Sequence, residues 1–410
     1  MNTLKNGITS LKISQCNMKE ITTEKVPIKM WLNEIEDGAL EQAKNLANLP
    51  FVFKHIAIMP DSHQGYGMPI GGVLATKDVI IPNAVGVDIG CGMCAVRTNL
   101  TEIDTETLKI VMGEIRKAIP VGFNKHELPQ DNEFECKYMP HPEGRPEKEW
   151  PICLREFDNA TKSIGTLGGG NHFIEIQKGS DGYIWIMIHS GSRNLGKQVA
   201  DHYNKIAIEL NEKYHSNVPK EWELAFLPIN SEEGQLYLKE MQYCVDFALA
   251  NRKLMIARIM DIFIAKTNCA GFDDIINIAH NYASLEKHFG HEVWIHRKGA
   301  TLATKDTIGI IPGSQGTKSY IVRGKGNIFS FQSCSHGAGR KMGRKEAERS
   351  LSLEEEIKKL DDQGIIHAIR GVKELDEAPG AYKDINIVMK NQDDLVDIMV
   401  ELTPLGVIKG

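Results

Sequence analysis

The stretch that decides the fold reads FVFKHIAIM at residues 51–59 and continues as PDSH at residues 60–63. The first nine residues form a short apolar run typical of a buried strand, and the next four are polar residues opened by a proline. Two later stretches repeat this arrangement: VIIP (79–82) leads to VGVDIGCG (85–92), and YIWIMI (183–188) leads to HSGSR (189–193). Strands that end in polar turns commonly carry an active site on a rigid sheet.

Around these strands, apolar residues at intervals of three and four predict helices at residues 102–118 and at about residues 235–266. We interpret the second as a core helix. Residues 125–150 are rich in Pro, Glu and Lys, which indicates an exposed excursion from the domain. Because candidate functional residues lie as far apart as positions 61 and 336, both halves of the chain must fold around one site. We therefore expect a single compact domain over residues 1–410.

The composition is that of a globular protein: 410 residues, 42% apolar and 25% charged, with a net charge of −6. Such a charge argues against a general polyanion-binding coat, so any nucleic-acid surface must be a local basic patch. Residues 1–15 hold no apolar stretch of signal-peptide length, and no segment is apolar enough to cross a bilayer. We expect a cytoplasmic protein whose eight cysteines are reduced.

A candidate set of metal ligands lies beside glycine or asparagine at the ends of predicted strands: Asp88, Cys91, His172, His189 and His280. A lone histidine is most often structural, but this mixture of carboxylate, thiolate and imidazole suits Zn²⁺, Mn²⁺ or Fe²⁺ better than Mg²⁺ or Ca²⁺. Cys91 and Cys94 also match a Cys-x-x-Cys pattern, typical of a redox site or half of a zinc site. Since no second such pair exists, we interpret Cys94 as a small buried side chain.

Two glycine-rich loops are weak nucleotide signals. GTLGGGNHFIE (165–175) has enough glycine for backbone N–H groups to approach an anion, but it does not match the dinucleotide fingerprint. PGSQGTKS (312–319) resembles a P-loop except that Thr317 separates the second glycine from the lysine. Ordinary tight turns explain either loop equally well.

A third glycine-bearing segment, SCSHGAGRKMGR (333–344), places His336 before a flexible turn and then a run of cations. Arg340, Lys341, Arg344 and Lys345 form the local basic patch that the composition requires. They are suited to holding phosphates while a neutral imidazole attacks phosphorus and forms a phosphoramidate. The alternative is a solvated helix start that carries a few charges.

A series of motifs, in order and spacing, resembles the tRNA-splicing ligase RtcB family from about residue 24 to residue 410. They are MPDSHQGYG (59–67), GVDIGCGM (86–93), GNHFIE (170–175), HSGSR (189–193), HNY (280–282), HRKGAT (296–301), IPGSQGT (311–317), HGAGR (336–340) and VIKG (407–410). The resemblance implies a single α+β domain with mixed β-sheets flanked by helices.

The resemblance also implies roles for individual residues. Asp88, Cys91 and His172 would bind one manganese ion, and Cys91, His189 and His280 a second, with Cys91 bridging. His336 would carry GMP covalently, and Asp61 would orient it. The implied guanylate contacts are Asn171, Glu175, His280, Asn281, Pro312, Gly313, Ser314, Gln315, Ser319, Gly337, Ala338, Gly339, Tyr382 and Lys409. We expect RNA contacts from Arg193, Arg297, Lys298, Arg340 and Arg344.

The implied activity is GTP-dependent ligation of RNA. His336 would take GMP from GTP and pass it to an RNA 3′-phosphate, which a 5′-hydroxyl end would then attack; a 2′,3′-cyclic phosphate would first be opened by hydrolysis. The substrate would be tRNA halves or other cleaved RNA. We expect the protein to be a monomer. The sequence leaves open whether a second protein activates it. The alternatives are a metal-dependent RNA phosphoesterase and a non-catalytic RNA-binding factor.

Overall fold

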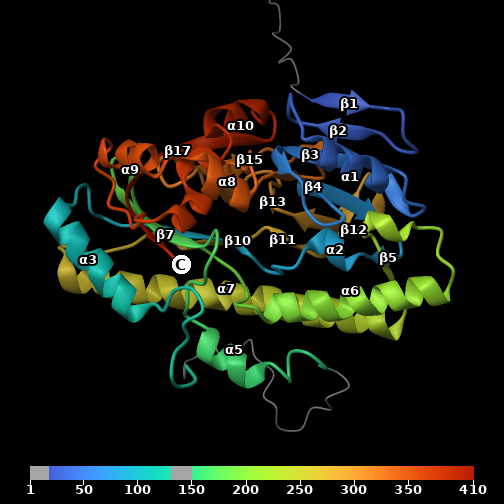
Figure 1. The fold of residues 1–410 in the computed structure, drawn as a ribbon, viewed down its shortest axis with the longest axis horizontal. Helices are drawn as coiled ribbons and strands as arrows, with labels where there is room; N and C mark the ends of the chain where they lie inside the picture. The colour runs from blue at the N-terminus through green and yellow to red at the C-terminus, as the bar shows by residue number, and fades with distance from the viewer. Residues whose placement is uncertain (1–17, 131–149) are drawn as a thin grey trace, which may run out of the picture.

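The computed structural model describes residues 18–130 and 150–410, and two β-sheets organise this part of the chain (Figure 1). The six-stranded sheet has the order β1 (Lys19–Ile21), β2 (Ile28–Met30), β3 (Val52–His63), β4 (Ile70–Thr76), β12 (His291–Lys298) and β11 (Asn281–His288). β2 and β3 are parallel, whereas the other neighbours are antiparallel.

The seven-stranded sheet is antiparallel throughout. Its order is β10 (Ile276–Ala279), β6 (Gly92–Arg97), β8 (Ile184–Ser190), β7 (Phe173–Gly179), β17 (Val396–Lys409), β15 (Ser319–Gly324) and β14 (Ile308–Ile311). Two short pairs complete the strands: β13 (Ala300–Leu302) with β16 (Ser333–Ser335), and β5 (Val79–Ile80) with β9 (Leu227–Pro228).

Helices cover the sheets, and the longest of them, α7 (Glu232–Lys266), runs along one side of the molecule (Figure 1). The other helices are α1 (Asp37–Ala47), α2 (Pro82–Val85), α3 (Thr105–Ala118), α5 (Phe157–Ser163), α6 (Leu195–Lys213), α8 (Arg344–Ser350), α9 (Leu353–Asp361) and α10 (Ile385–Asn391). The 3₁₀ turns are η2 (Lys220–Trp222), η3 (Ile328–Ser330), η4 (Val372–Glu377) and η5 (Pro379–Ala381). The expected α+β fold is confirmed.

Both predicted helices are present and begin at side-chain caps. Asp104 accepts hydrogen bonds from the backbone of the first turn of α3, and Ser231 does the same for α7, satisfying donors that have no partner within the helix. α7 packs as a core helix, as expected: Met255, Ile256 and Ile259 are buried with residues of α3, β7 and β8 in one apolar cluster. Within residues 18–130 and 150–410, no helix is both long enough and apolar enough to span a membrane.

The predicted strands are present, but their ends differ from the prediction. β3 continues through the PDSH segment to His63, which pairs with Ile70, so Asp61 is delivered by the end of a strand and not by a loop. β5 stops at Ile80, because Pro82 begins the one-turn helix α2. Of the predicted excursion at 125–150, only residues 125–130 and 150 are described; Leu128 is exposed and Trp150 is buried in the core.

Candidate active site

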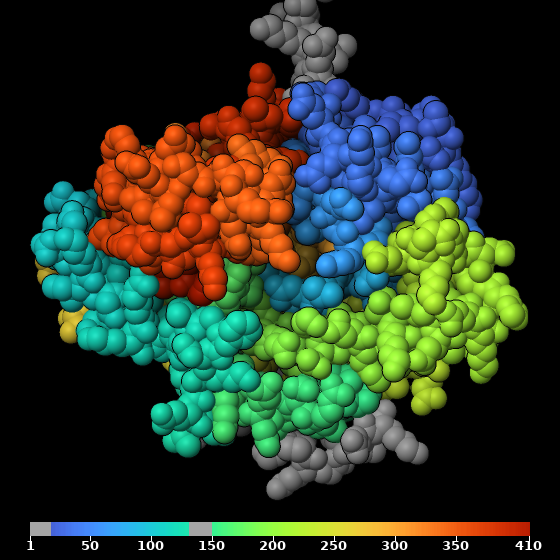
Figure 2. All heavy atoms as spheres, viewed as in Figure 1, coloured from blue at the N-terminus to red at the C-terminus, as the bar shows by residue number. Residues whose placement is uncertain are grey.

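A cavity of about 1190 Å³ lies where the two sheets meet, and residues from position 36 to position 409 line it. β3, β4 and β12 of the six-stranded sheet lead into its wall on one side. β7, β8 and β17 of the seven-stranded sheet lead into it on the other. Figure 2 shows the surface hollowed between the orange segment that includes α8 and the blue segment that includes β3 and β4. The site is therefore built from both halves of the chain, as expected.

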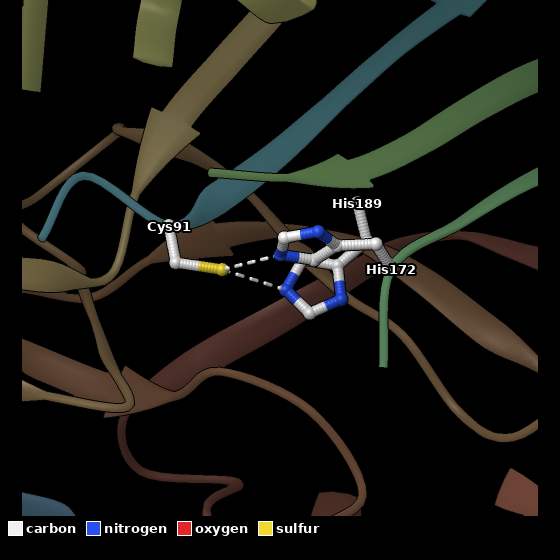
Figure 3. A group of neighbouring side chains, drawn as sticks. All are labelled: Cys91, His172 and His189. Atoms are coloured by element: carbon white, nitrogen blue, oxygen red, sulfur yellow. Dashed lines mark hydrogen bonds between the residues drawn. The ribbon is translucent and has the colours of Figure 1, made fainter. Parts of the chain in front are cut away.

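Three of the predicted metal ligands converge at this cavity, and two of them, Cys91 and His189, line it. The Cys91 sulfur lies 3.2 Å from His189 Nε2 and 3.6 Å from His172 Nε2. The donor atoms of these three buried residues all lie within 4.8 Å of one another. Figure 3 shows the sulfur facing both imidazole rings. This is the arrangement expected of groups that share a cation.

The other two predicted metal ligands flank this trio. Asp88 Oδ2 lies 3.3 Å from His172 Nε2, and the His280 ring is centred 5.3 Å from the His189 ring. Asp88 thus lies beside His172, and His280 lies beside His189. The division into two overlapping ligand sets stays a prediction, because the His172 and His189 rings are also centred 5.3 Å apart.

Close backbone packing fixes the position of Cys91. The chain turns between Asp88 and Cys91, whose backbone N–H donates to the Asp88 carbonyl oxygen at 3.1 Å, and β6 begins at Gly92. A Cβ atom at Gly92 would lie only 2.0 Å from the Ile278 carbonyl oxygen, so only glycine lets β6 approach β10 here. The glycine after the cysteine in the GCG motif is thereby explained by packing.

The protonation states of the histidine and cysteine side chains in this cluster favour binding of a cation. His189 Nδ1 lies 3.1 Å from the Asn171 carbonyl oxygen, to which it donates, so Nε2 keeps its lone pair toward Cys91. Burial holds the pKa of His189 well below its ordinary value, and the neighbouring His172 and His336 lower it further. Burial and the Asp88 charge raise the pKa of the Cys91 thiol, and a bound cation would reverse this by favouring the thiolate. The donor set suits a borderline transition metal.

His336 lies next to this cluster and is oriented by Asp61. Its ring is centred 4.8 Å from that of His280. Oδ2 of the fully buried Asp61 accepts from Nδ1 of His336 at 2.6 Å and from its backbone N–H at 3.0 Å. Because Nδ1 donates to a carboxylate, the Nε2 lone pair is left free. A partly exposed imidazole with a free nitrogen is equipped for nucleophilic attack.

Two glycines allow this arrangement. Gly339 has a φ of +72°, and a Cβ there would lie 2.1 Å from the Asp61 carbonyl oxygen. Gly299, with a φ of +60°, packs so closely that a Cβ would lie 2.4 Å from the Ile70 side chain and 3.0 Å from His336 Cε1. Any larger residue at either position would displace Asp61 or His336.

A group of charged and polar residues forms another part of the cavity wall, from β7, η4 and β17. Lys409 Nζ lies 3.4 Å from Glu377 Oε2, and Glu175 lies on the neighbouring strand, opposite Val407. Burial raises the pKa of Glu175 to about 8, although Lys409 opposes the shift. This wall offers a carboxyl group and an ammonium group to a polar planar ligand.

Most of the expected guanylate contacts line the cavity: Asn171, Glu175, His280, Asn281, Pro312, Gly313, Ser314, Gln315, Gly337, Ala338, Gly339, Tyr382 and Lys409. Ser319 does not. It lies behind the lining, where its hydroxyl accepts from the Gly313 N–H at 3.1 Å and from Gln177 Nε2 at 3.2 Å. Ser319 therefore supports the 312–317 loop from below.

Glu377 is a site residue that the sequence did not reveal. Its carboxylate is contacted by Arg340 at 3.2 Å and Arg344 at 2.5 Å, and it accepts a hydrogen bond from the Tyr382 hydroxyl. Burial raises the pKa of Glu377, but Lys409 and Arg344 outweigh it and hold the pKa below its ordinary value. No motif marks it, because KELDE (373–377) reads as an ordinary solvated stretch.

The five predicted RNA contacts lie in different environments. Arg340 and Arg344 line the cavity, although both pair with Glu377. Lys298 also lines it, but its ammonium group donates to the Tyr66 and Asn83 carbonyl oxygens at 2.6 and 3.0 Å. Lys298 thus braces the β3–β4 connection and α2.

Arg193 and Arg297 are turned toward the protein. Arg193 donates to the Thr166 hydroxyl at 2.9 Å and to the Gly122 carbonyl oxygen at 3.1 Å. The expectation that Arg297 contacts RNA is not met. Its side chain is fully buried and forms a two-pronged ion pair with Glu286, so it is not available to RNA. An arginine's place in a motif says nothing about its burial.

Comparison with known proteins gives a consistent answer. Residues 42–410 match the family model described as "tRNA-splicing ligase RtcB". The chain is 38% identical over 414 residues to the RNA-splicing ligase RtcB of Escherichia coli K12, covering 96% of this chain and all of that protein. It is 33% identical to the tRNA-splicing ligase RtcB of Thermococcus kodakarensis, covering 92% of each chain. The chain therefore belongs to the RtcB ligase family.

Proposed function

We propose that this protein joins RNA ends in a GTP-dependent reaction in which His336 is the covalent nucleophile. The observation that carries the proposal is the Asp61–His336 pair, whose imidazole stands 4.8 Å from the ring of a candidate metal ligand, His280. A nucleophile fixed beside a cation site and a basic cavity wall suits phosphoryl transfer. Membership of an RNA ligase family makes the acceptor an RNA end.

The reaction follows from the free nitrogen of His336. Nε2 attacks the α-phosphorus of GTP, forming an N–P bond as the bond to pyrophosphate breaks. An RNA 3′-phosphate oxygen then attacks the same phosphorus and releases His336. A 5′-hydroxyl end finally attacks the activated RNA phosphate, so that a phosphodiester forms and GMP leaves. Throughout, Asp61 keeps Nδ1 protonated and holds the ring in one orientation.

The guanine base fits the wall formed by Glu175 and Lys409. The edge of guanine presents two N–H donors and one carbonyl acceptor, which a carboxylate and an ammonium group would match. Tyr382 and the 312–315 loop would close around the remainder of the nucleotide. Adenine, which presents an acceptor at the position of the guanine ring N–H, would be rejected.

We propose that two Mn²⁺ ions are held by Asp88, Cys91 and His172 and by Cys91, His189 and His280. When bound, such ions would stabilise charge on the phosphates. The testable consequence is that Cys91→Ala should lower the content of both ions, because one thiolate contributes to each set. His172→Ala and His189→Ala should each weaken mainly one ion.

Metal analysis of the purified variants decides this point, with Cys94→Ala as the matched control. Cys94 is an equally buried cysteine three residues away, on β6, outside the cluster. Equal metal content in Cys91→Ala and the parent would contradict the shared thiolate.

The activity itself is tested by ligation. RNA substrates with a 3′-phosphate or a 3′-hydroxyl are incubated with a 5′-hydroxyl strand, with GTP and Mn²⁺ supplied or withheld. We expect joining only with the 3′-phosphate (or cyclic phosphate), GTP and Mn²⁺ together. RNA hydrolysis without GTP would favour the phosphoesterase. RNA affinity that survives metal removal without turnover would favour a binding factor.

Three further expectations stay predictions: that the protein acts in the cytoplasm, that it is a monomer, and that it works with or without an activating protein.

A further inference from the structure

One exposed aromatic side chain lies on the lining of the cavity and has no assigned role. Tyr66 is 68% exposed, the most exposed tyrosine among the described residues. Within residues 18–130 and 150–410, its ring has no aromatic or cationic partner and its hydroxyl has no hydrogen bond. Leaving so much of an aromatic ring in water forgoes the free energy that its burial would contribute. Such a ring at the edge of a substrate cavity indicates a ligand that covers it.

The backbone that carries Tyr66 is held firmly. On one side, Gln42 of α1 exchanges two hydrogen bonds with the backbone of Gly65, at 2.6 and 3.1 Å. On the other, the Gly67 N–H donates to Glu223 at 3.1 Å. The Tyr66 carbonyl itself accepts from the buried ammonium of Lys298 at 2.6 Å. A loop tied to three separate elements presents its side chain in a defined place, which lowers the entropy cost of binding.

The same Lys298 ammonium holds a second segment of the lining. It donates to the Asn83 carbonyl oxygen at 3.0 Å, and its stem packs against Gly86. Val87, 41% exposed, follows Gly86 and also lines the cavity. Tyr66 and Val87 thus lie on segments that Lys298 holds together, and both add apolar surface to the cavity lining. We call this surface the Tyr66 platform.

The position of the platform indicates which ligand covers it. Glu175 and Lys409, the proposed guanine contacts, belong to the seven-stranded sheet, whereas Tyr66 lies on the β3–β4 connection of the six-stranded sheet. His336 packs against Gly299, which follows β12, close to Ile70 at the start of β4. With GMP held by the seven-stranded sheet, the six-stranded side of the cavity is left for the RNA end. Lys341, Lys345 and Arg349 supply exposed cations on the lining for its phosphates.

We propose that Tyr66 stacks on an unpaired nucleobase of an RNA end that is being joined, and so positions its terminal 3′-phosphate or 5′-hydroxyl for reaction in this cavity. This inference rests on the proposed RNA ligation. Stacking on an aromatic ring accepts any base, because every base has a π face. The subsite is therefore selective for an unpaired terminal nucleotide and tolerant of its sequence.

The test compares Tyr66→Ala and Tyr66→Phe with the parent, and uses Tyr214→Ala as a matched control. Tyr214 is 64% exposed but lies outside this cavity. For Tyr66→Ala we expect the KM for RNA to rise about tenfold to a hundredfold, with kcat and RNA-independent attachment of GMP retained. Tyr66→Phe should behave as the parent because it keeps the ring, and Tyr214→Ala should ligate normally.

RNA that lacks the base of its terminal nucleotide identifies the partner. Removing the base from the end that stacks should weaken binding to the parent and have no further effect on Tyr66→Ala. The two ends are tested separately, so the experiment assigns the base to the 3′-phosphate or the 5′-hydroxyl strand. An unchanged KM in Tyr66→Ala, or a KM rise in Tyr66→Phe equal to that in Tyr66→Ala, would overturn the proposal. Failure of the parent to ligate would instead refute the proposed function.

Discussion

Asp61 decides which nitrogen of His336 is free to react. Its carboxylate accepts from Nδ1 of the imidazole and from the backbone N–H groups of His336 and Gly337. It therefore fixes both the tautomer and the direction of the ring. Histidines that depend on a carboxylate in this way lose most of their reactivity when the carboxylate is replaced by an amide.

We predict that Asp61→Asn will slow attachment of GMP to the protein by about 10²- to 10⁴-fold. The amide can present an N–H to Nδ1 and so stabilise the wrong tautomer. Metal content should be retained, because Asp61 belongs to neither ligand set. The initial rate of labelling by GTP is the measurement, and Asp78→Asn, an exposed aspartate, is the control. A rate within threefold of the parent would show that Asp61 does not orient His336.

Glu175 makes nucleotide binding depend on pH. Burial raises the pKa of its carboxyl group to about 8, so the group is mostly protonated at pH 7. Accepting hydrogen bonds from two N–H groups of guanine requires the ionised form. Affinity should therefore increase as the pH rises toward about 8 and then level off.

The expected increase is at most about tenfold per pH unit between pH 6 and 8, since one proton is released. Calorimetric titration with GMP over this range provides the measurement. Glu175→Gln, which cannot ionise, should bind GMP weakly and show no such rise. An equal pH dependence in Glu175→Gln would assign the effect to another group.

At the scale of residues, the sequence was informative where a motif combines unusual residue types. Cys91 is followed by Gly92, and His336 is followed three residues later by Gly339; packing forbids a side chain at both glycines, so the spacing carries structural information. Glu377 could not be predicted, because only the tertiary fold brings an ordinary glutamate against Arg340, Arg344 and Lys409. Arg297 was predicted wrongly, because its ion pair with Glu286 forms across β11 and β12.

At the scale of elements, β17 carries the end of the chain into the site. Figure 1 shows the C-terminus near the middle of the view, beside β7. Strand pairing continues to Lys409, opposite Phe173, whereas chain ends are usually frayed. Because the strand is paired as far as Lys409, the position of this residue is defined, which supports the expectation that Lys409 contacts the nucleotide.

Deleting residues 409 and 410 should abolish use of GTP and spare the fold. The truncation removes one pair of the β17–β7 ladder, so we expect the Tm to fall by no more than about 2–4 °C. Lys409→Met should show the same loss of GMP attachment. Lys325→Met is the control, because Lys325 forms an ion pair with Asp397 at the other end of β17. Normal ligation by the truncated protein would remove Lys409 from the site.

Elements in which apolar residues recur at a regular interval were the most predictable part of the fold. The helix expected at 235–266 is α7, and its start at Glu232 follows the Ser231 cap. The end of β3 was harder to predict, because Pro60 normally interrupts strands. Here the register shifts between Ile58 and His63, and this irregularity allows the strand to continue to Asp61.

At the scale of the whole molecule, the active site requires both sheets. Asp61 comes from the six-stranded sheet, and His189 and Lys409 come from the seven-stranded sheet. We propose that the described residues, 18–130 and 150–410, fold as one domain, because neither sheet holds a complete site. Far-UV circular dichroism and tryptophan fluorescence should then report one unfolding midpoint. Trp31 lies beside the six-stranded sheet and Trp185 within the seven-stranded sheet, so separate midpoints would contradict this proposal.

The most direct test of the central claim is covalent labelling by GTP in the presence of Mn²⁺ and in the absence of RNA. We predict that a radioactive α-phosphate will mark the protein and that a radioactive γ-phosphate will not, because pyrophosphate leaves. The bond should break in acid, as expected of a phosphoramidate on histidine. His336→Ala should lose the label while keeping its metal ions. Retention of the α-label by His336→Ala would contradict the assignment of His336 as the nucleophile.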